Sequence, residues 1–284
     1  MNKFVVLADR VVLKVTGPDA FDFLQGLITN DMAQIADKGA ILAALLTPQG
    51  KINFEFFIAP IEGGYIVDTP KEGAGELFKK LSLYKMRANV ELEDLSAPSQ
   101  VVWVDGAVDQ LPGVLAQFAD PRFDQMGVRA VVADLDAISS DFVSGSLDDY
   151  LAKRLQHGVP EGGYDYAFGD IFPHEACYDL LNGVDFEKGC YVGQEVVSRM
   201  QHRATVRRRV VLVEGQSELP GPGAEIRTSA SLIGVLGSCL GNKGLGLVRL
   251  DRAAKAIAAG DQMGVEEGDV RLSLPTWASY DFSE

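Results

Sequence analysis

The chain has 284 residues, of which 47% are hydrophobic, and this composition is typical of a globular protein rather than a disordered one. Its formal net charge of −14 argues against general binding to nucleic acids or anionic membranes. No run of about 18 apolar residues occurs, so the sequence predicts no membrane-spanning helix.

The cysteines and the first residues indicate where the protein works. Cys177, Cys190 and Cys239 are widely spaced and form no CxxC pair, which argues against a disulfide framework and against a self-contained zinc or iron–sulfur site. A reducing compartment fits this pattern. Residues 1–10 do not read as a signal peptide or an Arg- and Ser-rich transit segment. We therefore expect a cytoplasmic, bacterial protein, and a mitochondrial matrix protein only if a transit peptide has been removed.

Residues 1–95 are predicted to form an α+β unit with a mainly antiparallel sheet. Valine-rich and alternating runs favour strands, and apolar residues at helical spacing favour helices. The predicted strands are residues 4–7, 11–15, 41–46, 52–58, 65–67 and 88–92, and the predicted helices are residues 16–30 and 72–86. We expect Thr16 to cap the first helix, with Asp19 completing a capping box.

The strand at residues 52–58 has one apolar face, whereas its other face carries Asn53 and Glu55. Taken alone, Glu55 is expected to face solvent.

Residues 96–203 are predicted to form a second α+β unit. Residues 101–104 and 128–133 read as strands, and Ser146 is expected to cap a helix that ends near Gly158. The following thirty residues show little periodicity but contain many aromatic residues. We therefore expect a long packed loop that brings Glu175 and Cys190 to one place.

Residues 204–284 are predicted to form a small β-barrel or sandwich, because short strands alternate with Gly and Pro turns. The predicted strands are residues 210–213, 224–227, 232–238 and 244–248.

The most unusual stretch of the chain is Lys188-Gly-Cys-Tyr-Val-Gly-Gln-Glu195, which we call the signature loop. If a helix begins near Gly193, Cys190 lies just before its positive end, and the helix together with Lys188 favours the thiolate form. Two interpretations stay open at this point, namely a reactive, partly exposed thiol and a small buried cysteine in a turn.

The signature loop resembles that of the folate-binding YgfZ proteins, whose mitochondrial relatives are the Iba57/Caf17 proteins. These proteins are paralogues of the glycine-cleavage T-protein, an aminomethyltransferase. The resemblance extends to Phe23-Leu-Gln-Gly-Leu-Ile-Thr-Asn-Asp31, to Pro48-Gln-Gly-Lys-Ile52 and to Pro173-His-Glu175, and it covers roughly the whole chain. It implies a folate-binding α+β body followed by a C-terminal β-barrel.

The resemblance also implies a function and a set of site residues. It implies an accessory protein in iron–sulfur cluster assembly or repair that binds tetrahydrofolate or a derivative and needs the signature cysteine. Glu175 is placed at the T-protein's pterin-binding glutamate, and its carboxylate can accept two N–H groups from the pterin edge. The functional thiol is expected at Cys190, with Lys188, Gln194 and Glu195 beside it, and the other expected folate-binding residues are Asn30, Asn53, Glu55 and Tyr191. Cys190 is also a candidate ligand of an iron–sulfur cluster shared with an assembly or client protein.

The sequence departs from the T-protein at the catalytic acid of that enzyme. In Gly50-Lys-Ile-Asn-Phe-Glu55 the first acid has become Phe54, and only Glu55 keeps a carboxylate. Phenylalanine cannot protonate a folate nitrogen, which weakens any claim of aminomethyl transfer. The alternatives are nevertheless a folate-dependent one-carbon transferase and an interaction scaffold with a vestigial folate pocket.

The remaining candidates are less specific. His174 and His202 are candidate bases or metal ligands, but for both of them a structural role is favoured. Cys177 and Cys239 are expected to be packing residues. Two basic clusters, which we call the 79–87 cluster and the 199–209 cluster, are competing sites for the glutamate tail of folate. The clusters consist of Lys79, Lys80, Lys85 and Arg87, and of Arg199, Arg203, Arg207, Arg208 and Arg209.

Overall fold

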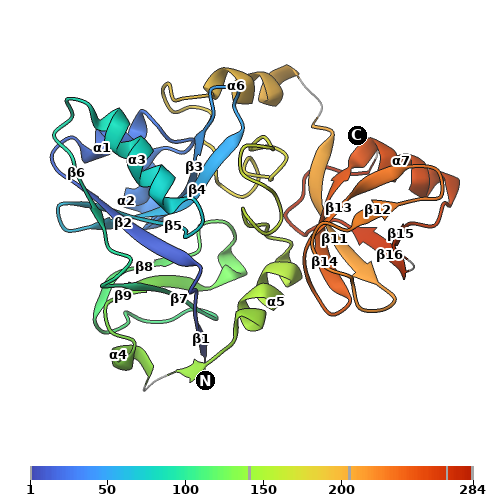
Figure 1. Ribbon diagram of the computed structural model, residues 1–284, viewed down its shortest axis with the longest axis horizontal. Coiled ribbons are helices and arrows are strands. Elements are labelled where there is room, and N and C mark those ends of the chain that lie inside the picture. Colours follow the sequence, from blue (N-terminus) through green and yellow to red (C-terminus); the bar gives the residue numbers. More distant parts are fainter. Residues whose placement is uncertain (1, 140–141, 204–205, 267, 283–284) are drawn as a thin grey trace. The chain divides into compact units, whose positions relative to one another are not determined.

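The computed structural model describes residues 2–139, 142–203, 206–266 and 268–282 (Figure 1). The chain divides into two compact units. The first unit consists of Met1–Tyr150 and Leu181–Gln194, and the second consists of Leu151–Leu180 and Glu195–Glu284. The boundaries at residues 95 and 203 that we expect from the sequence stay a prediction, and residues 204 and 205 lie outside the described residues.

The first sheet of the first unit is antiparallel and has the strand order β3-β4-β5-β2-β6. Its strands are β2 (Arg10–Thr16), β3 (Ile41–Leu46), β4 (Ile52–Ile61), β5 (Gly64–Pro70) and β6 (Glu91–Asp94). The predicted meander of β3, β4 and β5 is confirmed. The last strand begins three residues later than predicted and pairs with β2.

One face of this sheet is covered by helices, which are α1 (Ala20–Gln25), a 3₁₀ turn at Met32–Gln34, α2 (Ile35–Lys38) and α3 (Ala74–Lys85) (Figure 1). Leu24, Leu77 and Leu81 point from the helices into a core with Phe56 and Ile58 of β4. The helical spacing of the leucines and the alternation along β4 together create this core.

The first helix is shorter than predicted, and the capping box at Thr16 is wrong. The N-cap is Asp19, which makes no side-chain capping bond, and Gly17 adopts φ +111° before it. The helix ends at Gln25, and Ile28 instead forms an isolated β-bridge with Leu45. The apolar spacing that predicted a longer helix reflects burial of Ile28 in the same core.

The second sheet of the first unit has the order β10-β1-β7-β9-β8 and is antiparallel except for the pairing of β1 with β10. Its strands are β1 (Lys3–Val6), β7 (Gln100–Val104), β8 (Val114–Ala119), β9 (Val128–Val132) and β10 (Val143–Ser144). A 3₁₀ turn covers Asp124–Met126, and α4 covers Asp136–Ser139. The two N-terminal strands therefore enter different sheets.

The two sheets of the first unit contact each other through buried aromatic and charged residues. The Phe57 ring lies 6.2 Å from the Phe118 ring, and the Arg129 guanidinium lies 4.3 Å from the Phe57 centroid. Asp68 accepts hydrogen bonds from Arg10 at 2.7 Å and from Arg129 at 3.0 Å. The face of β4 that carries Phe57 and Glu55 is therefore covered rather than exposed to solvent.

The second unit begins within α5 (Leu147–His157) and continues through a long irregular segment to Leu180. The predicted cap of α5 is confirmed, since the Asp149 carboxylate accepts the backbone N–H of Ser146 at 2.9 Å. Gly158 ends the helix at φ +71°. Ile171, Ala176 and Tyr178 of the irregular segment are buried, which confirms that the segment packs.

After α6 (Gln194–Arg203), the described residues form a closed barrel with the order β11-β14-β13-β12-β15-β16, drawn in orange and red in Figure 1. Its strands are β11 (Arg208–Gly215), β12 (Glu225–Arg227), β13 (Leu232–Leu240), β14 (Lys243–Arg249), β15 (Gly264–Val265) and β16 (Gly268–Ser273). The predicted barrel is confirmed. Helix α7 (Leu250–Ala259) was not predicted.

Within the described parts of the chain, no helix is long and apolar enough to span a membrane.

Candidate functional site

Lys188 anchors the signature loop inside the first unit. Its side chain is buried, and its Nζ atom donates hydrogen bonds of 2.7 Å to the backbone carbonyl oxygens of Gln25, Ile28 and Asn30. Three charge-assisted hydrogen bonds of this length hold the start of the signature loop against the end of α1 and the segment that follows it. The ammonium is therefore directed into the protein.

Asp185 shapes the turn that precedes Lys188. Its Oδ1 accepts the backbone N–H groups of Glu187 at 2.7 Å and of Lys188 at 2.9 Å, and its Oδ2 accepts the side-chain amide of Gln34. Desolvation lowers the pKa of Lys188 to about 8, and the carboxylates of Asp31 and Asp185 act in the opposite direction. The turn and the ammonium are thus part of one polar cluster in the first unit.

Thr29 and Asn30 complete this attachment. The Thr29 hydroxyl donates to the carbonyl of Gly183 at 2.7 Å. The Asn30 amide donates to the carbonyls of Asn182 at 2.7 Å and of Leu42 at 2.8 Å. Both N–H groups of the Asn30 amide are engaged within the first unit, so a ligand could bind them only by replacing one of these contacts.

Cys190 is exposed at the surface of the first unit. No atom lies within 4 Å of the position that a Cβ atom would take at Gly189. Gly193 adopts φ +82°, and a Cβ atom there would lie 2.7 Å from the Thr47 carbonyl oxygen and 3.1 Å from the Gly50 Cα atom. Gly193 is therefore required for a close approach to the β3–β4 turn, whereas Gly189 leaves the space before the thiol open.

Tyr191 packs inward, next to the exposed cysteine. Its ring is buried with its centroid 5.3 Å from the Lys188 ammonium, and desolvation raises the pKa of Tyr191 to about 12, with Asp185 contributing. Helix α6 begins at Gln194, which confirms the helix start that was predicted near Gly193, shortly after Cys190. The reactivity expected of the thiol stays a prediction.

On β4, the candidate residues Asn53 and Glu55 lie on one face and Phe54 lies on the other. Phe54 packs against the core under the helices, with the Lys80 ammonium 5.6 Å from its ring centroid. Glu55 is only 2% exposed, and Asn53 is half-buried. The expectation that Glu55 faces solvent is wrong because the second sheet covers this face. Binding of folate by Asn53 and Glu55 stays a prediction.

In the second unit, Glu175 presents both carboxylate oxygens to one arginine. Arg208 donates from Nε to Oε1 at 2.7 Å and from Nη2 to Oε2 at 3.0 Å. The backbone N–H of Phe172 also donates to Oε2 at 3.0 Å. The side chain of Glu175 is 10% exposed and that of Arg208 is 36% exposed. Glu175 is therefore a two-point acceptor for paired N–H donors.

The residues next to this pair are held by their own contacts. Arg209 donates to the Asp179 carboxylate at 2.6 and 2.8 Å and to the His174 carbonyl at 2.6 Å. The His174 ring is buried with Nε2 3.0 Å from the Gln201 amide oxygen, and desolvation lowers the pKa of His174. A lowered pKa keeps this imidazole neutral at pH 7, which fits a structural role.

Cys177 and Cys239 both belong to the second unit. Cys177 is fully buried, at φ +60°, with Sγ 3.7 Å from the Tyr280 hydroxyl, and burial raises the pKa of its thiol. Cys239 is half-buried on β13, and burial raises the pKa of its thiol as well. The packing role predicted for Cys177 is confirmed.

Glu195, Ser198, Arg199 and His202 line a pocket of about 360 Å³ along α6. Their spacing of three and four residues places them on one face of the helix. The structure thus places His202 in the same pocket as Glu195. From the sequence, Glu195 was expected beside the Cys190 thiol.

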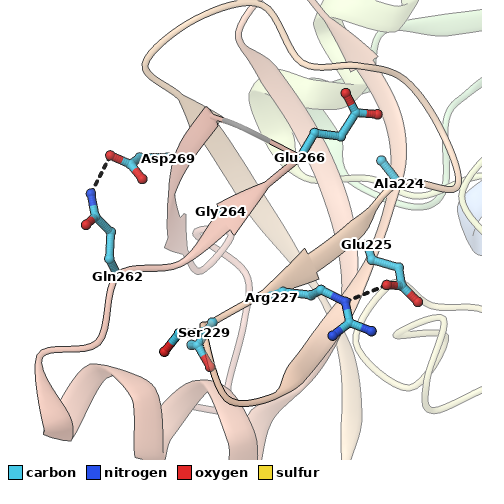
Figure 2. A pocket seen from close by; sticks show the side chains of 9 residues that line it. Ala224, Glu225, Arg227, Ser229, Gln262, Gly264, Glu266 and Asp269 are labelled. Atoms are coloured by element: carbon cyan, nitrogen blue, oxygen red, sulfur yellow. Dashed lines mark hydrogen bonds and ion pairs between the residues drawn. The ribbon is translucent and has the colours of Figure 1, made fainter.

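Figure 2 shows a larger pocket, of about 560 Å³, on the barrel. Arg227 pairs with Glu225 at 2.5 Å, and Gln262 donates to Asp269. The sequence singled out none of these residues. The lining side chains are mainly acidic or uncharged and polar, and several are paired with one another.

Among the described residues, no group of three or more His, Cys, Asp or Glu side chains is placed to hold a metal ion. Cys190 belongs to the first unit, whereas Cys177 and Cys239 belong to the second. Ligation of a shared cluster by Cys190 stays a prediction.

The arginines of the predicted 199–209 cluster have different roles. Arg199 and Arg207 are exposed, and the side chain of Arg203 lies outside the described residues. Arg208 and Arg209 instead form ion pairs with Glu175 and Asp179. Sequence reasoning missed both ion pairs, because their partners lie 33 and 30 residues away and no local pattern connects them.

Comparisons with known proteins agree with this architecture. A family model described as the C-terminal beta-barrel domain of CAF17 matches residues 207–280. The human "Iron-sulfur cluster assembly factor IBA57, mitochondrial" is 31% identical, and the match covers 95% of this chain and 84% of that protein. The IBA57 homologue of Coccidioides immitis is 30% identical over 87% of this chain and 71% of that protein.

The IBA57 homologue of Neurospora crassa is 32% identical over 76% of this chain, but the match spans only 56% of that longer protein. All three relatives are named as mitochondrial proteins. The cytoplasmic location that we expect from the sequence stays a prediction.

Among solved structures, the glycine cleavage system aminomethyltransferase T of Bartonella henselae has a similar fold. The TM-score is 0.74, and the match covers 99% of this chain and 87% of that one at 16% sequence identity. At this identity the likeness concerns the fold and not the reaction.

Proposed function

Because this chain belongs to the IBA57/CAF17-like family, we propose that it is an iron–sulfur cluster assembly factor that binds a reduced folate and uses the Cys190 thiol. The observation that carries the proposal is the match to the human assembly factor along almost the whole chain. Its partners in this role are other iron–sulfur assembly proteins or the client proteins that receive clusters.

The role of Cys190 rests on its exposure and on the attachment of its loop. The thiol is accessible, while Lys188 and Asp185 hold the residues immediately before it. A cysteine on a fixed loop can ligate iron without reorganising its own backbone. No three-ligand group occurs among the described residues, so we propose that a cluster is cargo held jointly by Cys190 and ligands of a partner protein.

Recognition of folate rests on Glu175. A pterin presents an amino group and a ring N–H side by side, and these match the two N–H donors that Arg208 now directs at the carboxylate. The chemistry of the acceptor therefore fits the proposed ligand. When bound, a reduced folate would supply one-carbon or redox chemistry, while Glu175 would orient its pterin ring.

A folate-dependent one-carbon transferase is the second candidate, and it rests on the resemblance of the sequence motifs to the glycine-cleavage T-protein, because the likeness to the solved aminomethyltransferase T concerns the fold alone. The motif resemblance assigns Phe54 to the position of that enzyme's acid, and Phe54 packs in the helix-covered core and cannot act as an acid. Retention of the fold with loss of this acid supports an assembly factor rather than a transferase.

Calorimetric titration with tetrahydrofolate tests the folate proposal. Glu175→Ala should weaken binding by about 1.5–3 kcal/mol, the value of a hydrogen bond to a charged group. Glu225→Ala, which removes an exposed acid elsewhere in the second unit, should leave the affinity unchanged. Equal affinities of wild type and Glu175→Ala would contradict folate recognition by Glu175.

A pair of ligands sharpens the same test. 6,7-Dimethylpterin carries the 2-amino group, whereas 6,7-dimethyllumazine has an oxygen in its place and lacks that donor. If Glu175 reads paired N–H donors, the pterin should bind more tightly to wild type, and this preference should disappear in Glu175→Ala.

A further inference from the structure

We propose that Arg208 is an internal stand-in for the ligand of Glu175, meaning that its guanidinium occupies the hydrogen-bonding position that the ligand would take. Competition with Arg208 then determines which ligands this carboxylate accepts and how tightly it binds them. This inference rests on the proposed function, because it concerns the pterin edge that Glu175 is proposed to bind. It goes beyond that function by assigning an opposing role to a residue that the sequence placed among possible ligand-binding cations.

The first step is that Arg208 occupies the paired acceptor positions of the Glu175 carboxylate. Oε1 accepts Arg208 Nε at 2.7 Å, and Oε2 accepts both Arg208 Nη2 at 3.0 Å and the Phe172 backbone N–H at 3.0 Å. The two guanidinium N–H groups approach in the paired geometry that a pterin edge would use. A ligand that binds Glu175 at two points must therefore displace the guanidinium.

The second step is that Arg208 is able to leave. Arg208 is the first residue of β11, and its side chain is 36% exposed. The guanidinium can therefore turn toward water without disrupting the packing of a core. The next residue behaves differently, since the Arg209 side chain is 9% exposed and is held by Asp179 and the His174 carbonyl. Only the first of these two arginines is suited to exchange with a ligand.

The third step concerns the class of ligand. Displacement of a guanidinium exposes an anionic acceptor with limited access to water, which must be satisfied again by paired donors. A 2-amino-4-oxopyrimidine edge provides two adjacent N–H groups that replace both hydrogen bonds of Arg208, whereas a ligand with a single donor replaces only one of them. Competition with Arg208 therefore favours ligands with two parallel N–H donors over ligands with one.

The cost of displacement sets the size of the effect. The observed dissociation constant equals the intrinsic constant divided by the fraction of molecules in which Glu175 is open. A partly exposed bidentate ion pair keeps that fraction at about one tenth, so removing the arginine should strengthen binding by about tenfold.

The test compares Arg208→Gln with Arg207→Gln by calorimetry, because Arg207 is an exposed neighbour whose replacement changes the net charge equally. The ligands are tetrahydrofolate and 6-methyltetrahydropterin, which has the pterin edge but no glutamate tail. We expect about tenfold tighter binding of both ligands to Arg208→Gln and no change in Arg207→Gln. Glu175→Ala combined with Arg208→Gln should abolish the gain.

The other possible outcomes would refute either the stand-in role of Arg208 alone or folate recognition by Glu175 together with it. If Arg208→Gln weakens tetrahydrofolate binding but not 6-methyltetrahydropterin binding, Arg208 contacts the glutamate tail, and the stand-in role is wrong. If wild-type binding depends on Glu175 but Arg208→Gln leaves it unchanged, the stand-in role fails alone. If neither ligand binds to any variant, folate recognition and the stand-in role both fail.

Discussion

Replacement of Lys188 by methionine tests whether the signature loop is held in place by a buried ammonium. Methionine has nearly the length of lysine without its charge, so the aliphatic part of the side chain can still pack. The variant removes three hydrogen bonds of 2.7 Å, to the carbonyls of Gln25, Ile28 and Asn30. The attachment of the loop to the segment after α1 should then weaken.

The size of the effect follows from these contacts. Each buried carbonyl that loses its partner costs about 1–3 kcal/mol, and three such losses give about 3–9 kcal/mol before compensation. Methionine carries no charge, so the variant avoids the several kcal/mol that burial of an ammonium costs, and this offsets part of the lost stability. We therefore expect Lys188→Met to lower the free energy of unfolding of the first unit by about 2–4 kcal/mol.

Urea unfolding followed by circular dichroism and tryptophan fluorescence measures this difference, with Trp103 reporting on the first unit. The matched control is Lys38→Met, which replaces an exposed lysine at the end of α2. A shift in the unfolding midpoint no larger than that of the control would refute the idea that the Lys188 ammonium anchors the loop.

Three further predictions concern the same loop and its thiol. Burial lowers the folded-state pKa of Lys188 to about 8, below its unfolded value of about 10.4, so the unfolded state binds more protons between these two pH values. The free energy of unfolding of the wild type should therefore rise with pH from about 8 to 10.4, relative to that of Lys188→Met. Parallel pH profiles of the two proteins would contradict this prediction. Gly193→Ala should lower the free energy of unfolding in urea by about 1–3 kcal/mol, because Gly193 has a positive φ and closely approaches the β3–β4 turn. Gly189→Ala should leave this free energy nearly unchanged, and equal losses in the two variants would contradict the geometry. In folded protein at pH 7.5, iodoacetamide should label exposed Cys190 well before buried Cys177, as measured by peptide mass spectrometry, and equal labelling would be inconsistent with the structure.

Local patterns were sufficient to predict most strands and the barrel. Alternation along residues 52–58 and the turns on either side predicted β4, and the glycine-rich strands of the C-terminal part predicted a barrel. Helix α7 was missed although Leu250, Ala253 and Ala256 follow helical spacing and Gly260 ends it in a left-handed conformation. The helical spacing was therefore present in the sequence, but it occurs in a region where we expected only strands and turns.

The features that define the candidate site depend on residues far apart in the chain. Glu55 reads as a surface residue of a half-exposed strand, and only the packing of the second sheet shows that it is buried. Lys188 finds its three carbonyl partners about 160 residues earlier, and Glu175 finds Arg208 at a separation of 33 residues. No periodicity encodes such pairs, so the sequence predicted the residues but not their contacts.

The most direct test of the central claim is complementation in cells from which the corresponding gene has been removed. Iron–sulfur enzyme activities are measured in extracts, with an enzyme that lacks a cluster as the reference and with equal amounts of each variant confirmed by immunoblot. We predict that wild type and Cys239→Ser restore these activities, whereas Cys190→Ser accumulates as a folded protein and does not. Full restoration by Cys190→Ser would contradict the proposal that this protein assembles clusters through the thiol of its signature loop.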